Sequence, residues 1–366
     1  MHKHATEAQK STEGMVDYDR NSSAQQSIIA GQETEIRRLV ERPGPIEPEL
    51  RIVDYGCGPG TSAITAVQPA IAAYRAKVPS GPMVVCHADQ PGNDWNALFK
   101  LIWGPTGYQV GVEGIRTEAA VGSFYDRLLT PNSVDLGTCF AASHWLSHAI
   151  RVYSPGALWF ADLEGDARRR LAELARNDWT RFLSLRANEL RSGGFLLVST
   201  LGSVPDETEP NGVAASGRGI YRTLQLVAQG MADDGLIDRK ILDEFVFSLW
   251  FLTADEARQP LQDDELLSRA FEIETITVTL APHNSSDSFA DLIADPVAYG
   301  DAYTGYTRAF ADSTLRDQLF RPSSRDLAHE NEIAQEFYDR FNDLYRTRLS
   351  KFAFELWHLK VVLRKR

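Results

Sequence analysis

Apolar and polar positions follow a repeating order over the first part of the chain. Short apolar runs of strand length alternate with longer segments in which apolar residues recur at helical spacing. The strand-like runs lie at 51–55, 83–88, 115–121, 134–140 and 195–201. A long helix is expected at 164–191, with an apolar stripe formed by Leu171, Leu174, Phe182 and Leu185. This alternation predicts an α/β fold with a doubly wound sheet.

The pattern changes after residue 203, where a loop rich in glycine, proline and acidic residues precedes mostly helical spacing. Residues 271–280 alternate between apolar and polar types, which predicts a strand with one solvated face, and 351–364 predict a final strand. The helical stretches at 205–268 and 283–348 are expected to be insertions that cap the carboxyl ends of the strands. Ligands of open α/β sheets bind at that edge, and a cap there would exclude water.

Composition places the chain among globular proteins and argues against some partners. Hydrophobic residues make up 43% and charged residues 24% of the sequence, and the net charge is −12. No basic run or basic helix face stands out, so no nucleic acid is expected as a partner. The polar N-terminus has no apolar signal segment, and no stretch of about 18 apolar residues is present, so no membrane span is expected. Cys57, Cys86 and Cys139 lack a pairing pattern, which favours a reducing compartment, the cytoplasm.

The most informative motif is LRIVDYGCGPG at 50–60, in which a buried strand precedes three glycines on alternate positions, Gly56, Gly58 and Gly60. These glycines allow a tight turn and the close approach of a ligand to the backbone. A dinucleotide site would require Gly-x-Gly-x-x-Gly, and a P-loop would require a Lys-Ser/Thr pair after the loop. The early third glycine and the preceding Asp54 favour S-adenosylmethionine (SAM), although another nucleotide or a structural turn also fits the motif alone.

The ends of the second and third strands carry further candidate ligand contacts. Asp89 follows the second strand, where an acid can reach the ribose hydroxyls of an adenosine ligand, although an acid there can equally cap a helix. Ser123 and Phe124 follow the third strand. The Phe124 ring would pack against an adenine ring or, as its spacing alone favours, belong to the core.

The segment SHWLSH at 143–148 follows the fourth strand. His144 and His148 are four residues apart and could share a helix face as metal ligands, but no third ligand lies nearby, so no metal is expected. Trp145 supplies one N–H donor, which either belongs to the core or orients a polar ligand group in an apolar pocket. The chain has no Gly-x-Ser-x-Gly or His-Glu-x-x-His motif.

In this order, the motifs resemble those of the SABATH family of methyltransferases over roughly residues 16–364. The matching segments are YDRNSSAQQ (18–26), DYGCGPG (54–60), DQPGNDWNALF (89–99), VGSFYDRLL (121–129), SHWLS (143–147), RANELRSGGFLLVSTLGS (186–203) and MADDGLIDRKILDEFVFSLWFLTADE (231–256). Members of the family methylate carboxylates of small hydrophobic acids, or ring nitrogens of xanthines. The resemblance therefore implies a class I methyltransferase fold, SAM as cofactor with S-adenosylhomocysteine as its product, and a homodimer.

The family pattern also implies roles for individual residues. It places Gln25 and Trp145 at the substrate carboxylate. It places a larger set at SAM, together with the glycine loop: Tyr18, Ser22, Asp54, Asp89, Gln90, Ser123 and Phe124. Ala141 replaces the tyrosine of many plant members, which removes one tether or enlarges the pocket, and Gln90 replaces the usual leucine beside the ribose. The less plant-like N-terminus and cap favour a microbial member of the fatty-acid type.

A carboxylate substrate suits this set of residues. It is ionised at pH 7 and already nucleophilic, so direct in-line methyl transfer requires alignment and exclusion of water but no general base. The Gln25 amide and the Trp145 N–H can hold one face of the carboxylate while an oxygen attacks. The body of the acid is expected under the cap, where four aromatic residues either line the pocket or belong to the core: Phe247, Trp250, Phe251 and Phe341. An alkyl or terpenoid acid is favoured over an aromatic one.

Two other functions are compatible with the sequence, namely N-methylation of a small heterocycle and SAM binding without catalysis. The joint retention of Asp54, Asp89, Gln25 and Trp145 argues against the second. The expected division of the chain is an N-terminal arm and helix over the active site (1–49), a SAM-binding core (50–204), a first cap segment (205–268), a core strand (269–282), a second cap segment (283–348) and a final core strand (349–366).

Overall fold

The computed structural model describes residues 29, 31–41, 49–280, 287–348 and 354–366. At its centre lies a mixed sheet of seven strands in the order β3-β2-β1-β4-β5-β9-β8. Its strands are β1 (Leu50–Tyr55), β2 (Met83–Asp89), β3 (Ile115–Val121), β4 (Val134–Phe140), β5 (Leu190–Leu201), β8 (Phe271–Leu280) and β9 (Trp357–Lys365). The α/β class with a doubly wound sheet is therefore confirmed.

Five neighbouring strands of this sheet are parallel, and β9 runs against both of its neighbours. β1 pairs with β2 and β4, β2 pairs with β3, and β4 pairs with β5, all in parallel register. β9 lies antiparallel between β5 and β8. Parallel neighbours require crossover connections, so the carboxyl ends of β1, β2 and β4 reach the same edge of the sheet. The loops that carry most of the predicted ligand contacts begin at that edge.

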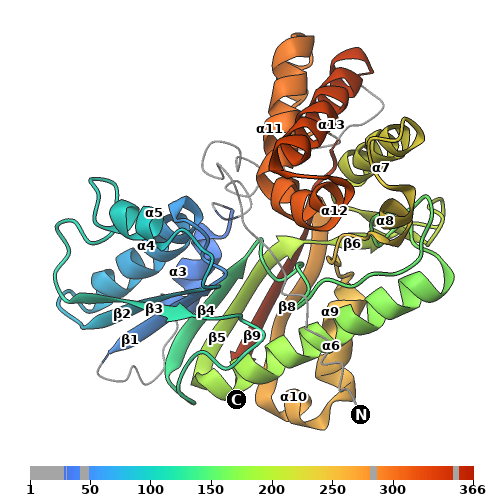
Figure 1. The fold of residues 1–366 in the computed structure, drawn as a ribbon. Coiled ribbons are helices and arrows are strands. Elements are labelled where there is room, and N and C mark those ends of the chain that lie inside the picture. The colour runs from blue at the N-terminus through green and yellow to red at the C-terminus, as the bar shows by residue number, and fades with distance from the viewer. Residues whose placement is uncertain (1–28, 30, 42–48, 281–286, 349–353) are drawn as a thin grey trace, which may run out of the picture.

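Helices cover both faces of the sheet (Figure 1). α3 (Glu33–Glu41), α4 (Thr61–Lys77) and α5 (Trp95–Ile102) enclose one core, which includes Ile52 of β1. The long helix α6 (Gly165–Glu189) packs on the other core, which includes Val53, because successive residues of a strand point to opposite faces. α9 (Ala254–Asp263) and α10 (Glu265–Ala270), which the sequence pattern grouped with the cap, instead contact α6 and β8.

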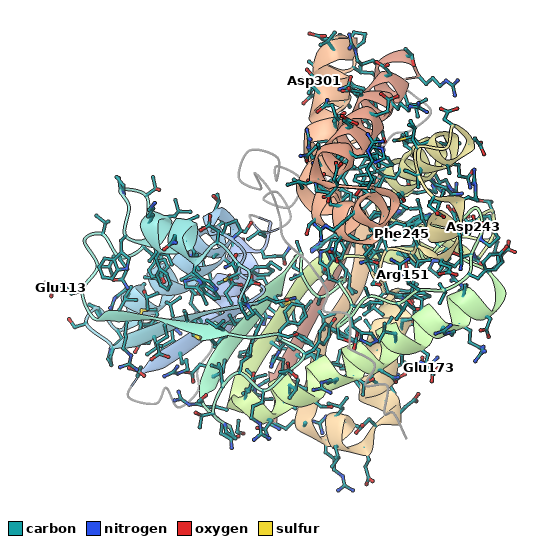
Figure 2. The ribbon with its side chains drawn as sticks, in the orientation of Figure 1. Glu113, Arg151, Glu173, Asp243, Phe245 and Asp301 are labelled. Carbon is teal, nitrogen blue, oxygen red and sulfur yellow. The ribbon has the colours of Figure 1, made fainter. Side chains whose placement is uncertain are left out.

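A second group of helices, which we call the cap, lies above the carboxyl end of β5 (Figure 1). It consists of α7 (Arg218–Asp233), α8 (Arg239–Glu244), α11 (Pro296–Leu315), the π-helical turn η2 (Arg316–Phe320), α12 (Arg321–Ser323) and α13 (Leu327–Thr347). In the sequence between β5 and α7, the short strands β6 (Ser203–Pro205) and β7 (Val213–Ala215) pair with each other. A 3-10 turn, η1 (Ala290–Leu292), precedes α11. Below the cap, Arg151 forms a β-bridge with Phe245 and donates to the Gln318 carbonyl at 3.2 Å (Figure 2).

Among the described residues, no helix combines the length and the hydropathy that a membrane span requires.

Candidate functional site

The loop after β1 is held by side chains at the end of β2 and in the loop that follows it. Gly56, Gly58 and Gly60 have φ values of 76°, 60° and 136°, which glycine adopts without steric strain. One carboxylate oxygen of Asp89 accepts a hydrogen bond from the Gly58 N–H at 2.7 Å, and the Asn93 amide donates to the Gly58 carbonyl at 2.9 Å. Asp89 and Asn93 thus order the glycine loop from the neighbouring strand end.

This loop forms one wall of a cavity at the carboxyl edge of the sheet, which we call the first cavity. Seven residues predicted as ligand contacts line it: Gly56, Gly58, Asp89, Gln90, Phe124, Ala141 and Trp145. The remaining lining residues are Cys57, Pro59, Ser62, Gly92, Asn93, Asp94, Phe140, Ala142 and Phe310. Most of these are neighbours of selected residues in the same motifs. Phe310 belongs to α11 in the cap, and no local signal in the sequence points to it.

A side chain at position 56 would collide with the opposite wall of this cavity. A Cβ atom on Gly56 would lie 2.5 Å from the Cβ atom of Ala142, and φ at Gly56 is +76°. We expect Gly56→Ala to lower the free energy of unfolding by about 2 kcal/mol and to weaken SAM binding, as measured by urea unfolding and calorimetry. Gly111→Ala is the matched control, because φ there is +73° but nothing lies within 4 Å of the added Cβ atom. Equal losses in the two variants would mean that the contact with Ala142 has no effect.

Two carboxyl groups lie at this cavity, of which Asp54 is buried and Asp89, in the cavity wall, is partly buried. Asp54 accepts a hydrogen bond from the Thr138 hydroxyl at 2.9 Å. Burial raises the pKa of Asp54 to about 7; the Thr138 hydrogen bond opposes this rise, and the nearby charge of Asp89 adds to it. Burial also raises the pKa of Asp89, against the effect of its backbone hydrogen bonds. A cationic ligand such as SAM, with its sulfonium and ammonium groups, would favour the ionised form of both carboxyl groups.

The sequence predicts six further contacts, and the described ones among them, Asp54, Gly60 and Ser123, do not line this cavity. Asp54 lies behind it, a Cβ atom on Gly60 would meet Leu101 of α5, and the Ser123 hydroxyl accepts a hydrogen bond from the Tyr125 N–H at 3.2 Å. The other three, Tyr18, Ser22 and Gln25, lie outside the described residues. The roles assigned to these six residues stay predictions.

The ring of Phe124, which lines the cavity, is held in place from α6. Its centroid lies 4.7 Å from that of Tyr125 and 5.8 Å from that of Phe182, the latter edge-on. The fully buried Arg186 donates to the Phe124 carbonyl at 2.8 Å and forms an ion pair with Glu189 at 2.8 Å. The position of Phe124 therefore depends on a buried charge pair that local sequence patterns did not single out.

Trp145 follows β4 and is fixed through its backbone and that of its neighbours. Its carbonyl accepts a hydrogen bond from the Tyr125 hydroxyl at 2.7 Å, and the Ser147 N–H donates to Asp178 of α6 at 2.7 Å. The side chain of Trp145 is buried but contributes to the cavity wall. No hydrogen bond of its indole N–H to another described residue is found, and we expect this donor to be available to a ligand in the cavity.

A second cavity opens beside Trp145 under the cap. It shares Ala141, Trp145 and Phe310 with the first cavity. Its other lining residues are His144, Leu201, Ser216, Gly217, Ile220, Tyr221, Tyr306 and Phe354. None of them carries a charge at neutral pH, since burial lowers the pKa of His144 to about 3. The second cavity is therefore suited to an apolar ligand group.

Ala141 occupies the junction of the two cavities in an unusual backbone conformation. Its φ angle is 49°, and its N–H donates to the Ser199 carbonyl at 2.9 Å. Residues other than glycine rarely adopt positive φ angles, and such residues cluster at functional sites. A larger side chain at this position would narrow the junction.

The two histidines of segment 143–148 make separate contacts. Nδ1 of His144 lies 2.8 Å from the Thr200 hydroxyl, and Nδ1 of His148 lies 2.9 Å from the Ser147 hydroxyl. In the described ranges of the chain, no cluster of three or more metal-ligand side chains is present.

The sequence left open whether four aromatic residues line the substrate pocket or belong to the core. Four aromatic residues predicted as candidates are buried in the core and line neither cavity: Phe247, Trp250, Phe251 and Phe341. The stretch that contains the first three runs beside the segment after β4, as the β-bridge between Trp145 and Leu249 shows. Its rings pack behind the cavity wall; Phe251, for example, lies edge-on to His144 at 5.4 Å. Apart from His144 and Trp145, the aromatic rings that line the second cavity come from α7, α11 and the residue Phe354 before β9.

Comparison with known proteins gives consistent similarities over the chain. Residues 5–366 match a family model described as SAM dependent carboxyl methyltransferase. The chain is 26% identical over 304 residues to gibberellic acid methyltransferase 2 of Arabidopsis thaliana, covering 77% of this chain and 75% of that protein. It is 27% identical over 280 residues to farnesoic acid carboxyl-O-methyltransferase of the same plant, covering 71% and 77%. The fold resembles that of a loganic acid methyltransferase structure with SAH, with a TM-score of 0.76, 20% identity and coverage of 97% and 98%.

Proposed function

The chain belongs to the SABATH family of SAM-dependent carboxyl methyltransferases, and from this premise we propose that it esterifies a small hydrophobic acid in the two joined cavities. The carboxylate of the acid meets the indole N–H of Trp145, and the body of the acid occupies the second cavity. The observation that carries this proposal is the membership of Trp145 in the walls of both cavities. The products are the methyl ester and S-adenosylhomocysteine.

We assign the first cavity to SAM, which supplies the methyl group when bound. The positive φ angles of Gly56 and Gly58 allow a ligand to approach the backbone closely. The carboxyl groups of Asp54 and Asp89 complement its positive charge. Phe124 is suited to pack against the adenine ring. The family pattern adds Gln90 at the ribose, and Ser123, Tyr18 and Ser22 as further contacts.

A carboxylate acceptor needs no general base, and among the described residues of the second cavity wall the imidazole of His144 is a weak base, since burial lowers its pKa to about 3. A carboxylate is ionised at pH 7, so its oxygen attacks the methyl group without losing a proton. The imidazole of His144 is neutral and bonded to Thr200, and no step requires it. The donors proposed for the carboxylate, Trp145 and Gln25, are neutral too. A fixed cation would stabilise the ionised ground state more than the partly neutralised transition state.

The lining of the second cavity favours an apolar acid with little polar decoration. Its walls are mostly aromatic and aliphatic, with Tyr221, Phe310 and Phe354 as large rings. Ala141, which has a small side chain, lines both cavities, and a small residue there suits a bulky group next to the carboxylate. We therefore place alkyl and terpenoid acids ahead of simple aromatic acids. The relatives named for farnesoic and gibberellic acids agree with this choice.

Two further properties follow from the same assignment. We propose that the enzyme is cytoplasmic, in keeping with its three free, buried cysteines. We also propose that it is a homodimer, as the family resemblance implies. Light scattering of the purified protein checks the second property.

Incubation with methyl-labelled SAM and a mixed panel of acids tests the proposed function. The panel contains fatty, terpenoid, aromatic and indole acids, and the extract is analysed for labelled methyl esters. We expect a labelled ester of an alkyl or terpenoid acid. Preference for benzoate or salicylate over octanoate or decanoate would overturn the proposed substrate class.

The same experiment separates the competing functions when xanthines are added to the panel. Labelled methylxanthine without any ester would indicate an N-methyltransferase. SAM binding by calorimetry without transfer to any compound of the panel would indicate a protein that binds SAM without catalysis.

A further inference from the structure

We infer that a polar network centred on Arg222 in the cap positions the wall of the second cavity and so determines which acceptors the enzyme takes. This inference rests on the proposed function, because it assumes that the second cavity holds the body of the acceptor. Arg222 is a positioning residue in this scheme, since it touches neither cavity itself.

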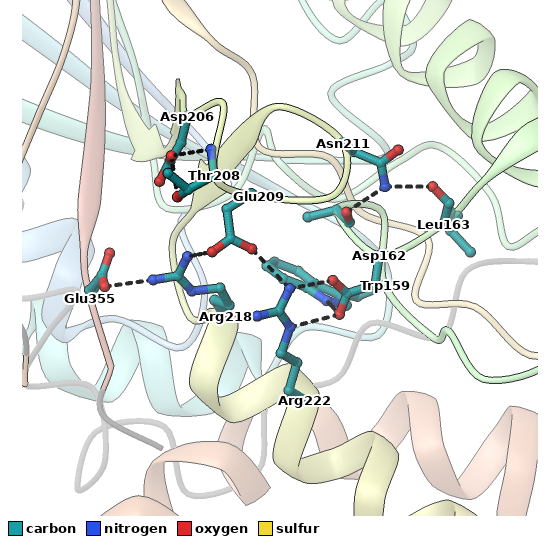
Figure 3. Close-up of polar contacts among 11 residues, drawn as sticks. Trp159, Asp162, Leu163, Asp206, Thr208, Glu209, Asn211, Arg218, Arg222 and Glu355 are labelled. Carbon is teal, nitrogen blue, oxygen red and sulfur yellow. Dashed lines mark hydrogen bonds and ion pairs between the residues drawn. The ribbon is translucent and has the colours of Figure 1, made fainter. Parts of the chain in front are cut away.

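The network joins α7 to three other segments of the chain (Figure 3). Arg222 donates hydrogen bonds to both carboxylate oxygens of Asp162, from Nη2 at 2.7 Å to one and from Nε at 3.1 Å to the other. Nη2 of Arg222 also pairs with Glu209 at 3.0 Å, and Glu209 pairs with Arg218 as well. Arg218 in turn donates to Glu355 at 2.9 Å. Two arginines on one helix thus hold three carboxylates that are far apart in the sequence.

The network reaches the second cavity through Trp159. The indole N–H of Trp159 donates to the Asp162 carboxylate at 2.6 Å. The Trp159 ring stacks on the ring of Tyr221, with centroids 4.9 Å apart and planes 6° from parallel. Tyr221 lines the second cavity, and Phe354, next to Glu355, lines it as well. Each end of the network therefore supports an aromatic ring of the cavity wall.

The geometry makes Arg222 the critical member. A planar guanidinium that binds both oxygens of a carboxylate fixes the orientation of that carboxylate as well as its position. Asp162 is further restricted because Asn211 donates to the carbonyls of Ala161 and Leu163, at 2.8 Å each, on either side of it. Loss of the guanidinium would leave the Asp162 side chain free to turn and Trp159 without a fixed acceptor. Tyr221 would then lose the rigid ring that supports it.

The consequence concerns the acceptor and not the cofactor. Gly217, Ile220 and Tyr221, at the start of α7, line only the second cavity, whereas the glycine loop and Asp89 line only the first. A looser α7 wall should therefore weaken binding of a well-fitting acceptor while SAM binding persists. A less rigid wall should also discriminate less between bulky and slender acceptors, because it can adapt to acceptors of different shapes.

Steady-state kinetics of Arg222→Met and Arg222→Lys test this inference, with the best acceptor from the panel as the probe. We expect KM for the acceptor to rise by about fivefold in both variants, with KM for SAM within about twofold of wild type. The lysine variant keeps the positive charge but loses the bidentate contact with Asp162. The charge alone should therefore not restore the wild-type KM for the acceptor. The preference between the best bulky and the best slender acceptor should narrow.

Arg340→Met is the matched control, because Arg340 forms ion pairs with Asp234 and Glu336 in the cap but lines neither cavity. It should leave both KM values and the acceptor preference unchanged. Unchanged acceptor KM in Arg222→Met would overturn the inference, as would parallel rises of both KM values with a lowered melting temperature. If the wild type methylates a heterocycle and no acid, the proposed function fails, but the same kinetics with that heterocycle still decide the role of Arg222.

Discussion

Replacing Trp145 with alanine is expected to lower the rate of methyl-ester formation by at least about tenfold, which is roughly 1.4 kcal/mol in the barrier. The indole N–H is the donor that the described structure offers to a carboxylate where the two cavities meet. Its loss would let the carboxylate rotate away from the line of methyl transfer, and alignment is a large part of the catalysis of such a reaction. Formation of labelled methyl ester at saturating SAM measures the effect.

Trp145→Phe separates the role of the N–H from that of the ring, because phenylalanine retains much of the apolar surface but has no donor. We expect the rate of methyl-ester formation to fall nearly as far in this variant as in the alanine variant. Trp103→Phe is the control, since Trp103 is 64% exposed and lies outside both cavities. Wild-type rates in Trp145→Phe would contradict the donor role. A comparable loss in Trp103→Phe would mean that the assay responds to tryptophan replacement in general.

Arg186→Met is expected to lower the free energy of unfolding by about 3–5 kcal/mol, because it leaves the buried Glu189 carboxylate without its cation. Both side chains of the pair are 0% exposed. Glu189 also accepts hydrogen bonds from the Tyr55 hydroxyl at 2.7 Å and from the N–H groups of Leu128 and Leu129 at 3.1 and 3.2 Å. The pair therefore joins α6, β1 and the loop after β3. Urea unfolding gives the change in free energy.

The control for this variant is Arg169→Met on the same helix. The ion pair of Arg169 with Asp166 is exposed, with 69% of each side chain accessible, and exposed pairs contribute about 0–1 kcal/mol. Since Arg186 also donates to the Phe124 carbonyl, the remaining folded Arg186→Met protein should bind SAM more weakly, which calorimetry can measure. A loss of less than about 1 kcal/mol in Arg186→Met would show that the pair contributes no more than a surface ion pair.

Helix α6 holds both the loop that lines the proposed SAM site and the loop that carries the proposed carboxylate donor. Arg186 holds the loop that carries Phe124 beside the first cavity, and Asp178 holds the Ser147 N–H two residues after Trp145. Because one helix contacts both loops, its position couples the proposed cofactor wall to the proposed carboxylate donor. This arrangement explains why charged residues of α6 are buried although the helix pattern alone suggests only an apolar stripe.

Local features of the chain were predictable because their causes are local. The strand-like runs at 115–121 and 134–140 coincide with β3 and β4. β4 is almost fully buried inside the sheet, as a mostly apolar parallel strand requires, whereas β3 lies at the edge of the sheet and is partly exposed. The glycine loop could be identified because positive φ angles at Gly56 and Gly58 restrict the residue type at those positions. Asp89 and Phe124 could be selected by their place after a strand, because parallel strands bring their carboxyl ends to one edge.

The sequence by itself thus determined the α/β class, the parallel part of the sheet, the loop at its carboxyl edge and, through the ordered motifs, the family. It did not determine which aromatic residues face the substrate. Phe247 and Phe251 are as apolar as Phe310 and Phe354, yet the first two are buried in the core and the last two line a cavity. Only the tertiary structure decided this, because core and ligand pocket both select apolar side chains. The packing of cap helices from distant parts of the chain decides which of those side chains line a cavity and which are buried in the core.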